Sequence, residues 1–144
     1  MKLLVYGLLL VLAMNGMDKC DPEMEGQAVN LNETFELELD KTVVIKGEKM
    51  GITFSKKQEG RCPLEVNCIQ AGEARATLQL TNGSGTETLV LEAKGLCHKE
   101  DGSCGETKTA MGYSLKLISL SPYPGSEADN MKEPVKAILM VSKN

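Results

Sequence analysis

Residues 74–92 read ARATLQLTNGSGTETLVLE, and this stretch decides the fold. Small and aliphatic side chains alternate with polar ones up to Leu80, which is the pattern of a strand with one buried face and one wet face. The NGSG sequence at residues 82–85 supplies the residue types typical of a turn, and residues 86–92 continue as a second strand. The stretch therefore predicts an antiparallel hairpin.

The same alternation recurs on both sides of this hairpin. It covers residues 34–39 and 112–120, and residues 42–45, 51–55 and 135–141 are predicted as further short strands. About seven short strands at this spacing predict an all-β domain, an immunoglobulin-like antiparallel β-sandwich, with a small β-barrel as the alternative. Residues 135–141 are almost continuously apolar, which predicts a strand that is buried on both faces or central in its sheet.

The N-terminus carries the pattern of an export signal over residues 1–19. Lys2 precedes an unbroken apolar run, residues 3–13, and polar residues close it. The run is too short for a transmembrane helix, which needs roughly 20 apolar residues. Residues 20–32 are interpreted as a polar tether, and residues 33–144 as one disulfide-braced β-sandwich domain.

Cys20 stands directly after this run, where a bacterial lipoprotein carries its acylated cysteine. The chain has five cysteines, so pairing of four leaves one for a lipid. Met17, Asp18 and Lys19 are unfavourable for lipoprotein processing, so a nearby cleavage site that leaves Cys20 removed, free or paired between chains stays open. We expect an exported protein, either a periplasmic or outer-membrane lipoprotein that meets the membrane only through a lipid on Cys20, or a secreted protein.

The other four cysteines form two short loops in the sequence, Cys62 to Cys68 and Cys97 to Cys104. Two local disulfides are predicted because an exported chain meets an oxidising environment. Crossed pairing is one alternative. Zinc binding that includes His98 is another, although paired zinc ligands usually stand only two to four residues apart. We therefore predict no metal and no cofactor.

Composition and charge disfavour two further functional classes. The net charge is −4 and the basic residues are spread singly, whereas nucleic-acid binding needs clustered lysine and arginine. His98 is the only histidine, and its polar neighbours Glu100, Asp101 and Ser103 all lie in one loop. No catalytic triad can be assembled from them, so no catalytic residue is assigned.

Residues 61–68 read RCPLEVNC and form the most distinctive segment. A disulfide around a loop that contains proline holds the backbone rigid, and rigidity lowers the entropic cost of binding. We predict that Arg61, Leu64 and Glu65 contact a partner there. The alternative is that the loop only clamps a crossover between the sheets.

Two segments of this region, EGRCP at residues 59–63 and VNCIQAGEA at residues 66–74, resemble a motif of small secreted or lipid-anchored bacterial proteins of unknown function, common in Bacteroidetes. The LSPYP segment at residues 120–124 is also similar to that layout. Gln70 stands where the family usually has tryptophan, and Gly60 where it usually has serine. The resemblance implies a β-sandwich lipoprotein that keeps the first disulfide, and it implies no activity.

Together these features predict a non-catalytic binding module of the cell envelope, with a protein or a glycan as its partner. A secreted protease inhibitor that presents the Cys62 to Cys68 loop is one alternative function. A small envelope enzyme is the other.

Overall fold

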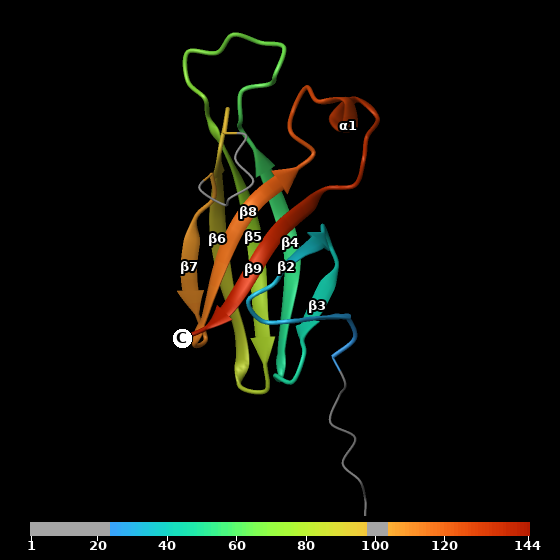
Figure 1. Cartoon of the computed structure of the whole chain (residues 1–144), viewed down its shortest axis with the longest axis vertical. Helices are drawn as coiled ribbons and strands as arrows, with labels where there is room; N and C mark the ends of the chain where they lie inside the picture. The colour runs from blue at the N-terminus through green and yellow to red at the C-terminus, as the bar shows by residue number, and fades with distance from the viewer. Residues whose placement is uncertain (1–23, 98–103) are drawn as a thin grey trace, which may run out of the picture.

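The computed structural model describes residues 24–97 and 104–144, which form a β-sandwich (Figure 1). The described residues contain nine strands: β1 (Gln27–Val29), β2 (Thr34–Glu38), β3 (Thr42–Ile45), β4 (Met50–Glu59), β5 (Glu73–Asn82), β6 (Gly85–Lys94), β7 (Thr107–Ala110), β8 (Tyr113–Ser121) and β9 (Lys136–Lys143). One sheet has the order β1-β3-β4-β5-β6 and the other the order β2-β9-β8-β7. The predicted sandwich is confirmed, and the two sheets do not close into the alternative barrel.

The predicted hairpin is formed by β5 and β6, which pair antiparallel from Glu73 opposite Lys94 to Asn82 opposite Gly85. The Asn82 side chain accepts hydrogen bonds from the backbone N–H groups of Ser84 and Gly85, at 2.8 and 3.2 Å. This bonding fixes the turn, as asparagine does in many tight turns. All other neighbouring strands are antiparallel except β1 and β3, which run parallel.

The core lies between the two sheets and is built from the inward-facing residues of the alternating strands. Burial of one large aliphatic or aromatic side chain contributes roughly 1.5–3 kcal/mol. The largest fully buried side chains are Phe54, Leu37, Ile45, Met50, Ile52, Leu78, Leu80, Leu91, Leu115, Leu117, Leu139 and Val141. The core is therefore almost wholly aliphatic, as the alternation predicts.

Two strands escape the sequence patterns. β1 lies inside the segment interpreted as a tether, yet it pairs with β3 and buries Val29. It is too short to show a period. β7 reads TKTA and has no large aliphatic residue, so only its pairing with β8 identifies it.

The C-terminal strand and the segment before it also refine the prediction. β9 is central, between β2 and β8, as one of the two interpretations requires. Its burial alternates along the strand, so it is not buried on both faces. The loop that precedes it holds one short helix, α1 (Glu127–Asn130), whose first turn is capped by the Ser126 side chain.

The two flanks of the sandwich differ. On one flank, β6 and the segment just before β7 connect the sheets, because Lys94 N–H donates to Cys104 O at 2.9 Å and Glu106 N–H donates to Glu92 O at 3.0 Å. On the other flank, β1 and β2 are the outer strands of their sheets. The sandwich is therefore bridged along β6 and β7 and open along β1 and β2.

The loop of residues 60–72, between β4 and β5, projects from one end of the sandwich (Figure 1). The first described residues and the C-terminus lie at the opposite end. Among the described residues, no helix is both long enough and apolar enough to cross a bilayer.

Candidate functional site

Three neighbouring segments form what we call the loop end: residues 60–72, 95–97 and 122–133. Direct backbone hydrogen bonds join them. Leu64 N–H donates to Pro124 O at 3.1 Å, and Gly95 N–H donates to Gly72 O at 2.8 Å. Segments that are distant in the sequence are thus held as one surface.

Both predicted disulfides are present, Cys62–Cys68 and Cys97–Cys104. At the neck of the first loop, Cys62 N–H also donates to Ala71 O at 2.8 Å. Two disulfides are compatible with an exported protein in an oxidising environment. The predictions that concern residues 1–19, Cys20, His98 and its acidic neighbours lie outside the described residues.

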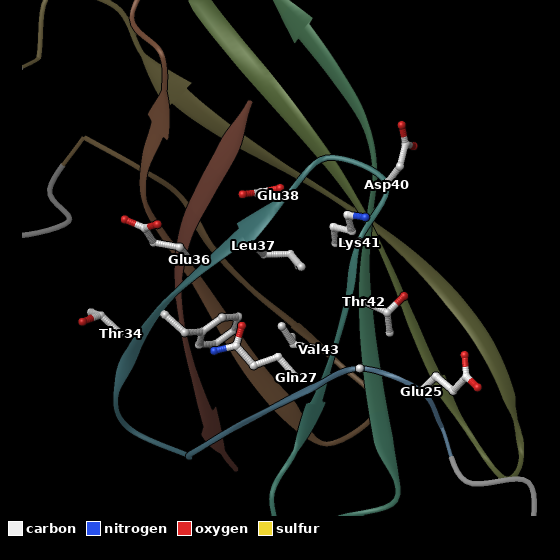
Figure 2. Close-up of a pocket in the computed structure, with 12 residues that line it drawn as sticks. Glu25, Gln27, Thr34, Glu36, Leu37, Glu38, Asp40, Lys41, Thr42 and Val43 are labelled. Atoms are coloured by element: carbon white, nitrogen blue, oxygen red, sulfur yellow. The ribbon is translucent and has the colours of Figure 1, made fainter. Parts of the chain in front are cut away.

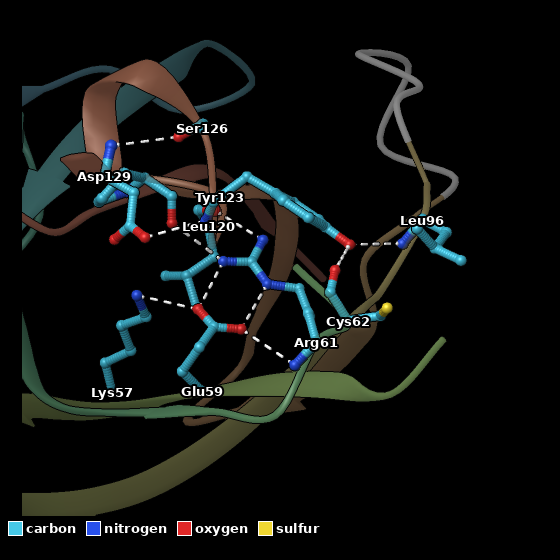
Figure 3. A network of polar contacts seen from close by, with 11 residues as sticks. Lys57, Glu59, Arg61, Cys62, Leu96, Leu120, Tyr123, Ser126 and Asp129 are labelled. Carbon is cyan, nitrogen blue, oxygen red and sulfur yellow. Dashed lines mark hydrogen bonds and ion pairs between the residues drawn. The ribbon is translucent and has the colours of Figure 1, made fainter. Parts of the chain in front are cut away.

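Arg61 is buried, although the sequence analysis predicts that it contacts a partner at the surface. It is only 6% exposed, so its assignment as a surface contact is corrected. Its Nε and Nη2 atoms donate to the two carboxylate oxygens of Glu59, each at 2.7 Å. Its Nη1 and Nη2 atoms also reach Leu120 O at 2.8 Å and Pro122 O at 3.1 Å (Figure 3). Arg61 is therefore an internal anchor that ties the loop to the end of β8.

Glu59 is the negatively charged partner of Arg61. Burial raises the pKa of Glu59, but the hydrogen bonds from Arg61 and from Lys57 outweigh it and hold the pKa of this carboxyl below its usual value. Lys57 Nζ lies 2.9 Å from Glu59 Oε2. The carboxylate thus stays ionised near neutral pH, where it balances the buried guanidinium.

Tyr123 links the two disulfide loops, a role that the sequence analysis missed. Its ring centroid lies 4.6 Å from Arg61 Cζ, which is a cation–π distance. Its hydroxyl donates to Cys62 O at 2.9 Å and accepts from Leu96 N–H at 2.8 Å (Figure 3). The only sequence signal was its position between two prolines in the SPYP segment.

The loop end carries most of the exposed large hydrophobic side chains of the described residues. The described residues expose six large hydrophobic side chains, and five of them lie on the loop end: Leu64, Val66, Ile69, Leu96 and Met131. Ile69 is fully exposed. Leu64 and Glu65, two of the three predicted contacts, are exposed as well.

Gln70 is also on this surface, so the tryptophan that the resembling family usually carries there would be exposed in this fold.

The charged groups beneath the surface pair with one another. Arg61 and Glu59 form one ion pair, so neither is available as a free acid or base. Within the two described ranges, no cluster of histidine, cysteine or acidic side chains has the geometry of a metal site.

Comparison with family models, with curated proteins and with solved structures gives no match for this chain. The resemblance to the Bacteroidetes proteins therefore stays a prediction.

Proposed function

We propose that this chain is an exported, non-catalytic binding module of the cell envelope whose loop end contacts a protein partner. The observation that carries the proposal is that five of the six exposed large hydrophobic side chains of the described residues gather there. Apolar clusters on the surface of a soluble domain commonly mark interaction sites. These five side chains are aliphatic, which suits a protein surface better than a sugar ring.

The rigidity of the loop end supports the same role. The Cys62–Cys68 disulfide, the Arg61–Glu59 pair and the Tyr123 hydroxyl each restrain the backbone under the exposed side chains. A surface that is ordered before binding loses little entropy when the partner docks. The apolar contacts then contribute to affinity with a small ordering cost.

The position of the loop end suits a tethered protein. The first described residues lie at the other end of the sandwich from residues 60–72 (Figure 1). A lipid on Cys20 would therefore anchor the end that faces away from the apolar loops. The loop end would then point from the membrane toward partners in the surrounding compartment.

The backbone of the loop favours binding over protease inhibition. Val66 N–H donates to Pro63 O at 3.2 Å, which closes a turn over Leu64 and Glu65. Inhibitors that mimic a substrate present an extended segment to the protease cleft. A turn instead projects its side chains, here Leu64 and Glu65, toward a binding partner.

A photocrosslinking side chain placed at Ile69 in the full chain, expressed in its native cells, is expected to capture a defined protein. The same group at Val90, an exposed apolar position on β6, is the matched control. With the captured partner purified, Ile69→Asp is expected to weaken binding about tenfold or more, because an apolar anchor is replaced by a charge. Val90→Asp is expected to leave the dissociation constant unchanged.

Equal crosslinking from both positions, or equal losses of affinity in both variants, would contradict the proposed role of the loop end. So would slowing of a protease panel by the purified protein with loss of that effect on reduction. That last result would assign the inhibitor function instead.

The tethered location has a test of its own. The intact mass of the protein from its native cells is expected to equal that of a chain that begins at Cys20 and carries acyl groups. After reduction and alkylation, the mass should rise by one alkyl group for each of the cysteines in the Cys62–Cys68 and Cys97–Cys104 disulfides. A mature chain that lacks Cys20, or carries it unmodified, would show that the protein is not lipid-anchored.

A further inference from the structure

The open flank of the sandwich presents an unpaired strand edge. β2 is the outer strand of its sheet and pairs only with β9. Leu39 N–H donates to Val135 O at 2.9 Å in the register that continues β2 and β9. In an antiparallel ladder, successive residues direct their N–H and C=O groups alternately toward the neighbouring strand and away from it. Phe35 and Leu37 therefore direct these groups to β9. Thr34, Glu36 and Glu38 direct theirs away from β9, to the open side.

Some of the outward groups are already used, and others are open. Glu38 O accepts a hydrogen bond from Lys41 N–H at 3.1 Å. Among the described residues, the backbone N–H and C=O of Glu36 have no backbone partner on this side. A free edge of this kind is a template for another extended strand.

A groove lies beside this edge. Its volume is about 860 Å³, within the range of roughly 300–1,000 Å³ that ligand sites occupy. Figure 2 shows β2 along one side, and β3 with the segment of residues 25–27 along the other. The side chains of Leu37 and Val43 lie between the two sides but are almost fully buried, so Phe35, which is half-buried, is the large apolar side chain of the lining that keeps exposed surface.

The rim of the groove is acidic. Its lining contains four carboxylates and one ammonium group, from Glu25, Glu36, Glu38, Asp40 and Lys41. Glu36 shares its charge with Lys136 of β9, at 3.1 Å. Glu38 stands opposite the same Lys136 in the β2–β9 ladder, and its charge helps to raise the pKa of that lysine, so two glutamates share one cation. The charge on the rim complements a basic occupant.

We propose that β2 binds an extended peptide segment of a partner protein by strand addition, and that this segment alternates lysine or arginine with aliphatic residues. The partner backbone pairs with the open groups of Glu36. Its basic side chains lie on the outer face beside Glu36 and Glu38, because oppositely charged side chains across a strand pair attract. Its aliphatic side chains enter the groove beside Phe35. This site is separate from the loop end and does not depend on the function proposed there.

Two other occupants fit the charges less well. A second copy of β2 would set glutamates against glutamates, and like charges directly opposite each other are destabilising. The chain's own residues 20–25 read CDPEME, which is acidic and contains a proline. A basic strand from another protein has neither defect.

The probe is a synthetic peptide that alternates lysine and valine, with blocked ends, added to the isotope-labelled mature chain. The expected result is saturable NMR shifts centred on the amides of residues 34–38, with affinity that falls as salt is added. A peptide with glutamate in place of lysine is the control and is expected not to bind. Glu36→Gln should weaken binding about threefold, because it removes one cross-strand charge pair.

Glu36→Pro separates backbone pairing from charge. Because the Glu36 N–H points away from β9, proline removes a donor that the fold itself does not use, as edge strands tolerate. It should weaken binding about tenfold, which is more than Glu36→Gln does, since a backbone hydrogen bond is lost as well. Glu87→Gln, an exposed acid on β6, should leave binding unchanged.

Four results would overturn the proposal. The first is the absence of shifts in residues 34–38. The second is equal binding of the acidic peptide. The third is that both variants, Glu36→Gln and Glu36→Pro, bind the basic peptide as tightly as the wild type does. The fourth is self-association through β2 that excludes the peptide, which would show that a second copy is the occupant.

Discussion

Replacing Arg61 with alanine is expected to lower the free energy of unfolding by about 3–5 kcal/mol, because two buried carbonyl groups and a part-buried carboxylate lose a charged donor, at roughly 1–3 kcal/mol for each group. The substitution leaves the Glu59 carboxylate with Lys57 as its remaining cationic partner, and it removes the donors that reach the carbonyl oxygens of Leu120 and Pro122. The cation–π contact with Tyr123 is lost with them. Urea denaturation of the wild type and the variant measures the loss.

Arg75 is the matched control, because it is also an arginine held by ion pairs, in its case with Glu73 and Glu92. Its side chain is 47% exposed, so Arg75→Ala should cost only about 0–1 kcal/mol. A double variant that also carries Glu59→Gln should recover part of the Arg61→Ala loss, since a neutral side chain then replaces the part-buried carboxylate that lost Arg61. Similar losses for Arg61→Ala and Arg75→Ala would show that Arg61 is not a buried anchor.

Replacing Gly72 with alanine is the second change with a large expected effect, a loss of about 2–5 kcal/mol in the free energy of unfolding. Gly72 has φ +69°, where a side chain costs roughly 1–2 kcal/mol. Its added Cβ would also overlap the carbonyl oxygen of Gly60 across the neck of the loop. Forcing atoms into such a packed contact adds about 1–3 kcal/mol.

Gly47→Ala isolates the first of these two costs. Gly47 has φ +79°, and an added Cβ would meet no atom within 4 Å. This variant should therefore lose only about 1–2 kcal/mol. In the Gly72 variant, hydrogen exchange should also accelerate at the amides of Cys62 and Gly95, which donate across the neck. Equal losses for the two glycines, with unchanged exchange, would contradict the role of the neck.

The two predictions concern the same physical arrangement. Arg61 holds the loop end from below, and Gly72 allows the chain to close its neck. If either is removed, the exposed Ile69 and Leu64 lose their fixed positions. A partner that recognises a pre-ordered surface should then bind more weakly, so the loop end connects the stability of the fold to its proposed function.

Much of the fold follows from local sequence patterns. The alternation in residues 74–92 predicts the hairpin of β5 and β6, because a strand with one buried face places apolar side chains at every second position. The spacing of the cysteines favours the two local disulfides, because two cysteines that are close in the sequence meet easily. β1 and β7 escaped because each is held by pairing with another strand and carries no apolar period of its own.

The sequence by itself therefore determined the all-β class and most strand positions, and it favoured the two local disulfides that the structure contains. Only the tertiary structure decided that Arg61 is an anchor instead of a contact. Its partners at Leu120 and Pro122 are carbonyl groups of a distant segment, and every residue carries such a group, so no side-chain pattern announces them. The same reason applies to the open edge of β2, because which strand ends a sheet depends on how all the strands are ordered in space.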